Sequence, residues 1–329
     1  MAASNYTLCD TYASVTVAAS TLTGASTLIL DCEARDLGCT NGVLSIISIS
    51  DVDATTIFLI DALALPDSSH PAFTPLFDLL RSEAVTKLMW DGRADALELR
   101  EVYGVELGGV LDLQLAEVVS RRNVRGEKDD FRRRRLATGY FREMALDISR
   151  NPGEYDGIYQ VSGMNAALKA RNIRDNKDAT VLDLQKAQGS GIWLERPLPE
   201  TLLRYAAHDL SLIAMLYASF MRGGWIKENN VALLKEQSAR YMRTFRTREI
   251  KDLFDDSKVA MFVPLHVLEA PPGNAQLIEC LWCKQQLPLR CFTVRRDAGR
   301  VQQRSTLCKL CAALAKRDSE GSRGEWVAV

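Results

Sequence analysis

The stretch Thr27-Leu28-Ile29-Leu30-Asp31-Cys32-Glu33 decides the fold, because it is a continuous apolar run that ends in two acidic residues. Such a run is typical of a buried strand. Side chains alternate between the two faces of a strand, so Asp31 and Glu33 are expected to point in the same direction. The sequence therefore predicts a buried strand that delivers two carboxylates to one place.

A second acidic signature, Tyr205-Ala206-Ala207-His208-Asp209, lies inside the helical pattern of Pro199 to Met221. Residues four apart share one face of a helix, so Tyr205 and Asp209 are expected on the same face and His208 on another, as a packing or surface residue. If the fold brings the two signatures together, one pocket holds three carboxylates and a phenol. Such carboxylates need a cation, and hard divalent cations prefer carboxylate oxygens. This pattern predicts metal-dependent phosphate chemistry.

The segments around these signatures alternate between strand and helix patterns. Strands are expected at Gly42–Ser50, Thr55–Ile60 and Thr86–Trp90, and helices at Phe73–Glu83, Ala94–Tyr103, Leu113–Ser120, Met164–Ala170 and Val231–Phe254. Three early strands in succession, followed by alternating strands and helices, favour an α/β fold in which a mixed sheet is flanked by helices.

A two-metal site needs three or four carboxylates around cations about 4 Å apart, so a fourth acidic residue is expected. The segment between Lys87 and Leu97 offers two candidates, Asp91 and Asp95. Asp95 lies just inside a helix that leaves a strand end, where it can reach over the edge of the sheet. Asp91 is better placed to cap that helix. We prefer Asp95 as the ligand and keep Asp91 as the alternative.

Together these segments resemble the DEDD superfamily of 3′–5′ exonucleases, specifically the tyrosine-bearing branch that includes ribonuclease D-like proteins. Asp31-Cys32-Glu33 looks like its first motif, the segment from Trp90 through Ala116 is similar to its second motif and sequel, and Arg196 to Asp209 resembles its third. The histidine-bearing branch has a His where Arg204 stands, so Tyr205 assigns the branch. The resemblance covers roughly residues 5 to 222, with Trp90 and Leu113 departing from the residues usual in the family.

The resemblance implies a ribonuclease H-like fold and hydrolysis of 3′-terminal phosphodiesters of RNA or DNA, with release of nucleoside monophosphates. It implies two Mg or Mn ions held by Asp31, Glu33, Asp209 and Asp95, the last directly or through water. Tyr205 would orient the attacking water, because a phenol with a pKa of about 10 is a poor base at neutral pH. The alternative is a catalytically silent nucleic-acid-binding or scaffold protein that kept the fold.

The basic stretch from Arg121 to Tyr159 interrupts the alternation and is interpreted as an inserted, mobile or nucleic-acid-facing segment. Within it, Arg132, Arg133, Arg134 and Arg135 are candidate phosphate-binding residues, with Phe131 and Tyr140 as candidate stacking residues. Acidic neighbours dilute this patch. A solvated flexible loop and a nuclear-import signal are the alternative interpretations.

Two CxxC pairs near the C-terminus, Cys280/Cys283 and Cys308/Cys311, have the pattern of a tetrahedral zinc site with four thiolate ligands. A hairpin is expected between them, with strands at Phe292–Val294 and Gly299–Gln302, and a helix at Ala312–Asp318 after the second pair. This order favours a small treble-clef-like module with one structural Zn. Redox-active dithiols are the less favoured alternative, because no thioredoxin-like context surrounds either pair.

The role of this module is open between nucleic-acid binding and recruitment of a protein partner. Its candidate basic residues are Arg290, Arg295, Arg296, Arg300 and Arg304. Cys291 is expected to be a packed free thiol.

The chain has 329 residues and a net charge of −1, so no global field indicates a nucleic-acid partner. We expect an exonuclease domain at 1–222 with a basic insertion at about 121–159, a helical extension at 223–268, a linker at 269–275 and the zinc module at 276–329. No stretch is apolar enough to span a bilayer, and the N-terminus has no leader pattern. We therefore expect an intracellular protein without a membrane partner, with nuclear and cytoplasmic residence both open.

Overall fold

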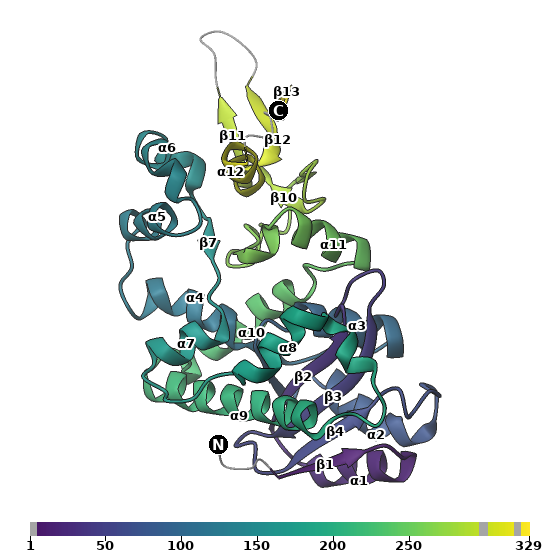
Figure 1. Cartoon of the computed structure of the whole chain (residues 1–329). Helices are drawn as coiled ribbons and strands as arrows, with labels where there is room; N and C mark the ends of the chain where they lie inside the picture. Colours follow the sequence, from purple (N-terminus) through teal and green to yellow (C-terminus); the bar gives the residue numbers. More distant parts are fainter. Residues whose placement is uncertain (1–4, 296–301, 319–323) are drawn as a thin grey trace. The chain divides into compact units, whose positions relative to one another are not determined.

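The computed structural model describes residues 5–295, 302–318 and 324–329 and forms two compact units (Figure 1). Unit 1 consists of Met1–Glu117 and Ser162–Arg248, and unit 2 of Val118–Val161 and Glu249–Val329. The basic stretch, expected as an insertion in the exonuclease domain, thus forms one unit with the cysteine-rich end. This division differs from the domain boundaries predicted from the sequence.

Unit 1 is built on a six-stranded mixed sheet with the order β1-β4-β3-β2-β5-β6. Its strands are β1 (Tyr6–Cys9), β2 (Thr27–Arg35), β3 (Val43–Asp51), β4 (Ile57–Asp61), β5 (Thr86–Met89) and β6 (Val110–Asp112). Strand β3 runs antiparallel to β2 and β4, and the remaining pairs are parallel. The mixed α/β sheet predicted from the sequence is therefore confirmed, while the short strand β1 was not predicted.

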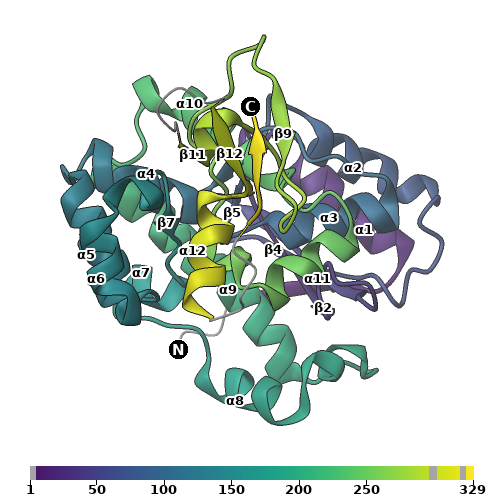
Figure 2. The same ribbon diagram turned by 90° about the horizontal axis from the view of Figure 1, so that it is seen from above.

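Helices flank this sheet. They are α1 (Tyr12–Leu22), α2 (Thr74–Arg81), α3 (Arg93–Tyr103), α4 (Leu113–Asn123), α7 (Met164–Ala170), α8 (Ala179–Gln188), α9 (Glu200–Arg222) and α10 (Glu228–Met242). The long helix α9 packs across β2, β3, β4 and β5 and is buried along much of its length. Helices α1 and α2 pack against one another (Figure 2), and α1 also contacts β1.

Strand β2 and helix α9 are the two elements that carry the acidic signatures. Strand β2 pairs with β3 on one side and β5 on the other, which makes it a central strand. Its register with β3 shifts between Glu33 and Ala34, and such bulges change the direction of neighbouring side chains. The packing of α9 across β2 places the two signatures on facing elements.

The charged helical region predicted at Val231–Phe254 consists of two helices, α10 and α11 (Arg248–Asp256). Helix α8 and helix α1 were not predicted. The 3₁₀ turns η1 (Pro71–Phe73) and η4 (Ser190–Leu194) precede α2 and α9 respectively. No helix among the described residues combines the length and apolar character needed to cross a bilayer.

Unit 2 combines the basic stretch with the cysteine-rich end. Its elements include α5 (Asp129–Thr138), α6 (Ala145–Arg150), η2 (Arg142–Met144), η3 (Pro152–Tyr155), β7 (Tyr159–Gln160), η5 (Val259–Met261), β8 (Phe262–Val263), β9 (Leu277–Glu279), β10 (Gln286–Pro288), η6 (Leu289–Cys291), β11 (Phe292–Arg295), β12 (Gln303–Cys308), α12 (Lys309–Arg317) and β13 (Trp326–Ala328). Strands β7 and β8 pair antiparallel and join the two parts. The interpretation of 121–159 as a flexible loop was therefore wrong.

An aromatic core explains why the two parts of unit 2 fold together. The ring of Phe141 lies 5.4 Å from that of Phe262 and 6.1 Å from that of Tyr155. The Tyr140 ring packs edge-on against both Phe141 and Phe262. Because Phe262 follows the basic stretch by more than a hundred positions in the chain, no local pattern could reveal this core.

Candidate active site

Asp31, Glu33 and Asp209 converge on one place in unit 1. One carboxylate oxygen of each lies within 4.8 Å of the others. Strand β2 supplies Asp31 and Glu33 on one face, as alternation requires, and α9 supplies Asp209 from the helix packed over that strand. The structure thus brings together three of the four predicted carboxylates.

The electrostatics of this acidic cluster favour an added cation. Burial, reinforced by the charge of Asp209, raises the pKa of Asp31 to about 7. Burial and the charge of Asp31 raise the pKa of Glu33 well above its usual value, and burial also raises that of Asp209. The Oδ1 atom of Asp209 is buried and accepts no hydrogen bond from the described residues. An unpartnered buried carboxylate oxygen beside two further carboxylates fits hard divalent cations.

Asp95 lies beside this cluster without entering the group of closely spaced oxygens. It is buried in the first turn of α3, and its Oδ1 atom accepts the backbone N–H of Cys32 at 2.8 Å. Burial and the charge of Asp31 raise its pKa well above the usual value. Asp95 therefore lies near enough to Asp31 for their charges to interact, outside the group of three closely spaced carboxylates.

Asp91 does not cap α3, contrary to expectation. The N-cap residue is Gly92, without a side-chain cap, and Asp91 instead forms a two-pronged ion pair with Arg93, with distances of 2.6 and 2.8 Å. The Arg93 side chain is buried between the rings of Tyr241 and Phe245. Asp91 is therefore engaged in a structural network at the start of α3.

Lys177 is a residue of the site that sequence reasoning missed. Its Nζ atom lies 2.5 Å from Asp209 Oδ2 and 3.3 Å from the Tyr205 hydroxyl. Burial alone would lower the pKa of Lys177. The charges of Asp209 and the neighbouring acidic groups nevertheless raise this pKa well above its usual value. The ammonium group therefore stays charged. Lys177 lies in an irregular segment, where no periodicity marks it.

Tyr205 and His208 both precede Asp209 on α9. Burial and the charge of Asp209 raise the pKa of Tyr205, so its phenol is protonated at neutral pH. His208 is largely buried, and its Nε2 atom lies 3.2 Å from Asp175 and 3.3 Å from the carbonyl oxygen of Asn176. These two contacts agree with the prediction that His208 is a packing residue. They hold the segment that carries Lys177 against α9.

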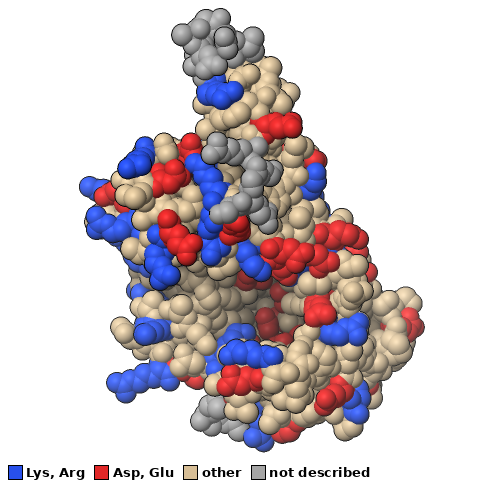
Figure 3. Space-filling view, turned by 45° about the horizontal axis from the view of Figure 1, so that its top comes forward, with Lys and Arg blue, Asp and Glu red and all other residues tan. Residues whose placement is uncertain are grey.

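The four arginines predicted to bind nucleic acid differ in their surroundings. Arg132 is buried, donates to the carbonyl oxygens of Tyr155 and Ile158, and lies over the Tyr159 ring, so the prediction is wrong for this residue. The other three lie near acidic or aromatic side chains: Arg133 near Asp156, Arg134 near Phe131, and Arg135 near Glu127. Figure 3 shows basic and acidic side chains interspersed on the visible face.

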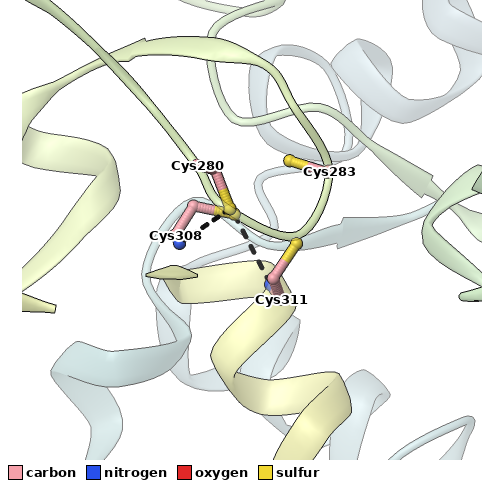
Figure 4. A group of neighbouring side chains, drawn as sticks. All are labelled: Cys280, Cys283, Cys308 and Cys311. Atoms are coloured by element: carbon pink, nitrogen blue, oxygen red, sulfur yellow. Dashed lines mark hydrogen bonds between the residues drawn. The ribbon is translucent and has the colours of Figure 1, made fainter. Parts of the chain in front are cut away.

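The second cluster of potential metal ligands consists of Cys280, Cys283, Cys308 and Cys311 in unit 2 (Figure 4). Their sulfur atoms lie within 4.8 Å of one another and all four residues are buried. The hydrogen bonds among the four thiols lower the pKa of Cys280 and raise the pKa values of Cys308 and Cys311, so these cysteines titrate as one coupled group. Cys291 is buried outside the cluster, as expected, and its pKa is raised to about 11 by burial.

The elements around the cysteines follow the predicted order of knuckle, hairpin and helix. Strands β9 and β10 flank the first pair, β11 and β12 form the antiparallel hairpin, and α12 begins between the cysteines of the second pair. The second hairpin strand is Gln303–Cys308, later than the predicted Gly299–Gln302, of which 299–301 lie outside the described residues. Arg296 and Arg300 lie outside them as well.

Residues 6–142 match the model of a 3′–5′ exonuclease family. Together with the fold of unit 1, this match defines the chain as a 3′–5′ exonuclease, a nuclease that hydrolyses and binds nucleic acid. The matched residues include Asp31, Glu33 and Asp95 and end before Tyr205 and Asp209.

Among solved structures, the chain is similar to RNase D of Trypanosoma brucei, with 23% identity, a TM-score of 0.54, and coverage of 74% of this chain and 73% of that one. The complex of that protein with RNA U12 gives 24% identity, a TM-score of 0.55, and coverage of 74% and 71%. Its GMP complex gives 23% identity, a TM-score of 0.55, and coverage of 74% of this chain and 64% of that one. At this identity the likeness establishes the fold. No curated protein matches the chain.

Proposed function

We propose that the chain is a tyrosine-bearing, metal-dependent exonuclease that removes nucleotides from the 3′ end of RNA. The observation that carries this proposal is the convergence of Asp31, Glu33 and Asp209, with Tyr205 one helical turn before Asp209. The first three residues would hold two Mg or Mn ions, with Asp95 contributing through water. Such ions make water a stronger nucleophile and neutralise charge on the leaving oxygen.

Within this proposal, the protein's own groups position the reactants. The Tyr205 phenol keeps its proton at neutral pH and therefore orients the attacking water as a hydrogen-bonding partner, without acting as a base. Asp95 links the first turn of α3 to β2 through Cys32 and so holds the strand that presents Asp31 and Glu33. Fixed carboxylates of this kind need no rearrangement during the reaction.

RNA is the proposed substrate because the similar Trypanosoma brucei RNase D has been solved with RNA U12 and with GMP. Its GMP complex is in keeping with a nucleoside monophosphate as product. The residues of the present site do not themselves distinguish ribose from deoxyribose, so DNA is the comparison substrate in the test below.

For unit 2 we propose one structural zinc ion, held by Cys280, Cys283, Cys308 and Cys311. The close spacing of the four sulfur atoms and the treble-clef-like order of the elements support it. The sheets around the cysteines have only two and three short strands, and a metal compensates for a small core. Surface residues of the module remain candidates for contact with RNA or a protein partner.

The proposed function is tested with purified full-length protein and single-stranded RNA or DNA labelled at its 5′ end, in Mg, Mn or EDTA. We expect a ladder that shortens from the 3′ end with release of nucleoside monophosphates, faster on RNA, and no cleavage in EDTA. Asp31→Asn and Asp209→Asn should reduce the rate by more than about 100-fold. Asp183→Asn, at an exposed position on α8, is the matched control.

Several results would contradict the proposal. Undiminished activity in Asp31→Asn or Asp209→Asn would place the reaction elsewhere. Endonucleolytic fragments would exclude a 3′-end mechanism. Folded wild-type protein that binds the oligonucleotide without shortening it under any of these conditions would instead support the catalytically silent alternative.

A further inference from the structure

The Lys177 side chain reaches into the acidic cluster from outside the elements that form it. Its Nζ atom contacts Asp209 Oδ2 and the Tyr205 hydroxyl, and its charge also interacts favourably with those of Asp31 and Glu33. The Lys177 side chain is 27% exposed, whereas that of Asp209 is 1% exposed. The ammonium group lies against the Asp209 carboxylate, where its charge balances the negative charge of the cluster.

A divalent cation and this ammonium group compete for the negative charge of the same carboxylate, that of Asp209. Asp209 Oδ2 is engaged by Lys177, while Asp209 Oδ1 has no hydrogen-bond partner in the part of the chain that the structure describes. A divalent cation bound by Asp31, Glu33 and Asp209 would stand a few ångströms from the ammonium, and two cations at that distance repel strongly away from bulk water. A cation bound by the three carboxylates and the ammonium group in its present position therefore destabilise one another.

The backbone around Lys177 is held, so only the side chain is free to move. The N–H of Lys177 donates to Asn165 Oδ1 at 3.0 Å, and His208 contacts Asp175 and Asn176 just before it. On the other side, Asp178 caps α8 through the N–H of Thr180. A lysine has a flexible four-carbon stem, which allows the ammonium to leave while the segment stays in place.

We propose that Lys177 is a built-in counter-ion that occupies the position of a divalent cation in the metal-free protein and swings outward when the cation binds. This inference rests on the proposed function, because it requires that the acidic cluster binds Mg or Mn. Lys177 stabilises the metal-free cluster by balancing its charge, and it lowers the apparent affinity for metal because its contact with Asp209 must first be broken. Metal occupancy is thereby set by competition within the chain.

The test measures Mn binding by isothermal titration calorimetry in full-length, zinc-loaded protein without nucleic acid. Lys177→Met removes the ammonium but keeps the length of the stem, and we expect its affinity for Mn to rise about tenfold. Lys177→Arg keeps the charge and should bind as weakly as wild type. Lys186→Met, on an exposed side chain of the neighbouring α8, is the matched control and should behave as wild type.

A second readout follows the side chain itself. Modification of Lys177 by an amine-reactive ester, quantified by mass spectrometry, should increase when Mn is added, while that of Lys186 stays unchanged. Equal or weaker Mn binding by Lys177→Met, or unchanged modification of Lys177 in wild type saturated with Mn, would overturn the inference. If Asp209→Asn binds Mn as well as wild type does, or no variant binds it, the proposed metal site itself fails, and the inference with it.

Discussion

The Oδ1 atom of Asp95 accepts the backbone N–H of Cys32 at 2.8 Å, and Cys32 lies between Asp31 and Glu33 in β2. This hydrogen bond joins the first turn of α3 to the strand that presents the first acidic signature. Asp95 thus has two separable properties: it accepts a structural hydrogen bond and it carries a charge beside the cluster. Substitutions that remove one property or both distinguish its roles.

Asp95→Asn should keep the hydrogen bond to Cys32, because the amide oxygen accepts it, and should remove the charge. We expect near-wild-type stability in urea denaturation but a loss of roughly 10–100-fold in exonuclease rate. Asp95→Ala should lose activity and also stability, by about 1–3 kcal/mol, because a buried N–H loses its partner. Full activity in Asp95→Asn would show that its role is structural alone.

The Arg93 network anchors the start of α3, and its loss should destabilise unit 1. Arg93→Met removes a buried guanidinium that pairs with Asp91 and lies 4.5 Å from the Tyr241 ring centroid. We expect the free energy of unfolding to fall by about 3 kcal/mol, measured by urea denaturation. Arg81→Ala, which removes an exposed pair with Asp78, should cost less than about 1 kcal/mol. Equal losses in both variants would contradict the assigned role.

Lys87 in β5 should make stability depend on pH. Its Nζ atom donates to the carbonyl oxygens of Leu79, Ser82 and Val85, and burial lowers its pKa from 10.5 to about 8. Between these two values the unfolded chain holds a proton that the folded chain has lost, so the free energy of unfolding should rise with pH.

The measurement for Lys87 is urea denaturation at several pH values from about 7.5 to 10 in wild type and Lys87→Met. The difference between the two proteins should change by up to about 1.4 kcal/mol for each pKa unit, in the direction that favours wild type at high pH. Lys186→Met is the exposed control. A difference that does not vary with pH would show that Lys87 titrates normally.

Removal of zinc should unfold both parts of unit 2. Helix α12, which begins at the second cysteine pair, also carries Lys316, whose ammonium contacts Asp147 and Glu154 in the basic stretch. We expect one zinc per chain by mass spectrometry, and loss of amide protection after chelation both in 276–329 and in 129–155.

The matched substitutions for this prediction are Cys283→Ala and Cys291→Ala. Both residues are buried in unit 2, but only Cys283 belongs to the cluster. Zinc should be lost in the first variant and kept in the second. Retention of zinc in Cys283→Ala would exclude Cys283 as a zinc ligand. Protection of 129–155 that survives chelation would show that this segment folds independently of the zinc site.

The two elements that carry the acidic signatures, β2 and α9, were predicted correctly because they have local patterns. The apolar run before Asp31 and the helical period around Asp209 indicate the strand and helix from neighbouring residues alone. Lys177 has no such pattern, because its role depends on where an irregular segment crosses α9. Arg132 shows the converse: its charge is visible in the sequence, but its burial beside Tyr155 and Tyr159 is decided by tertiary packing.

The most direct test of the acidic cluster as a catalytic metal centre is the anomalous scattering of Mn in crystals of the full chain. Anomalous peaks are expected within coordination distance of Asp31, Glu33 and Asp209, with the Lys177 ammonium moved away from Asp209. The same crystals of Asp209→Asn should show these peaks weakened or absent. Ordered crystals at saturating Mn without a peak at these three carboxylates would show that the acidic cluster is not a metal centre.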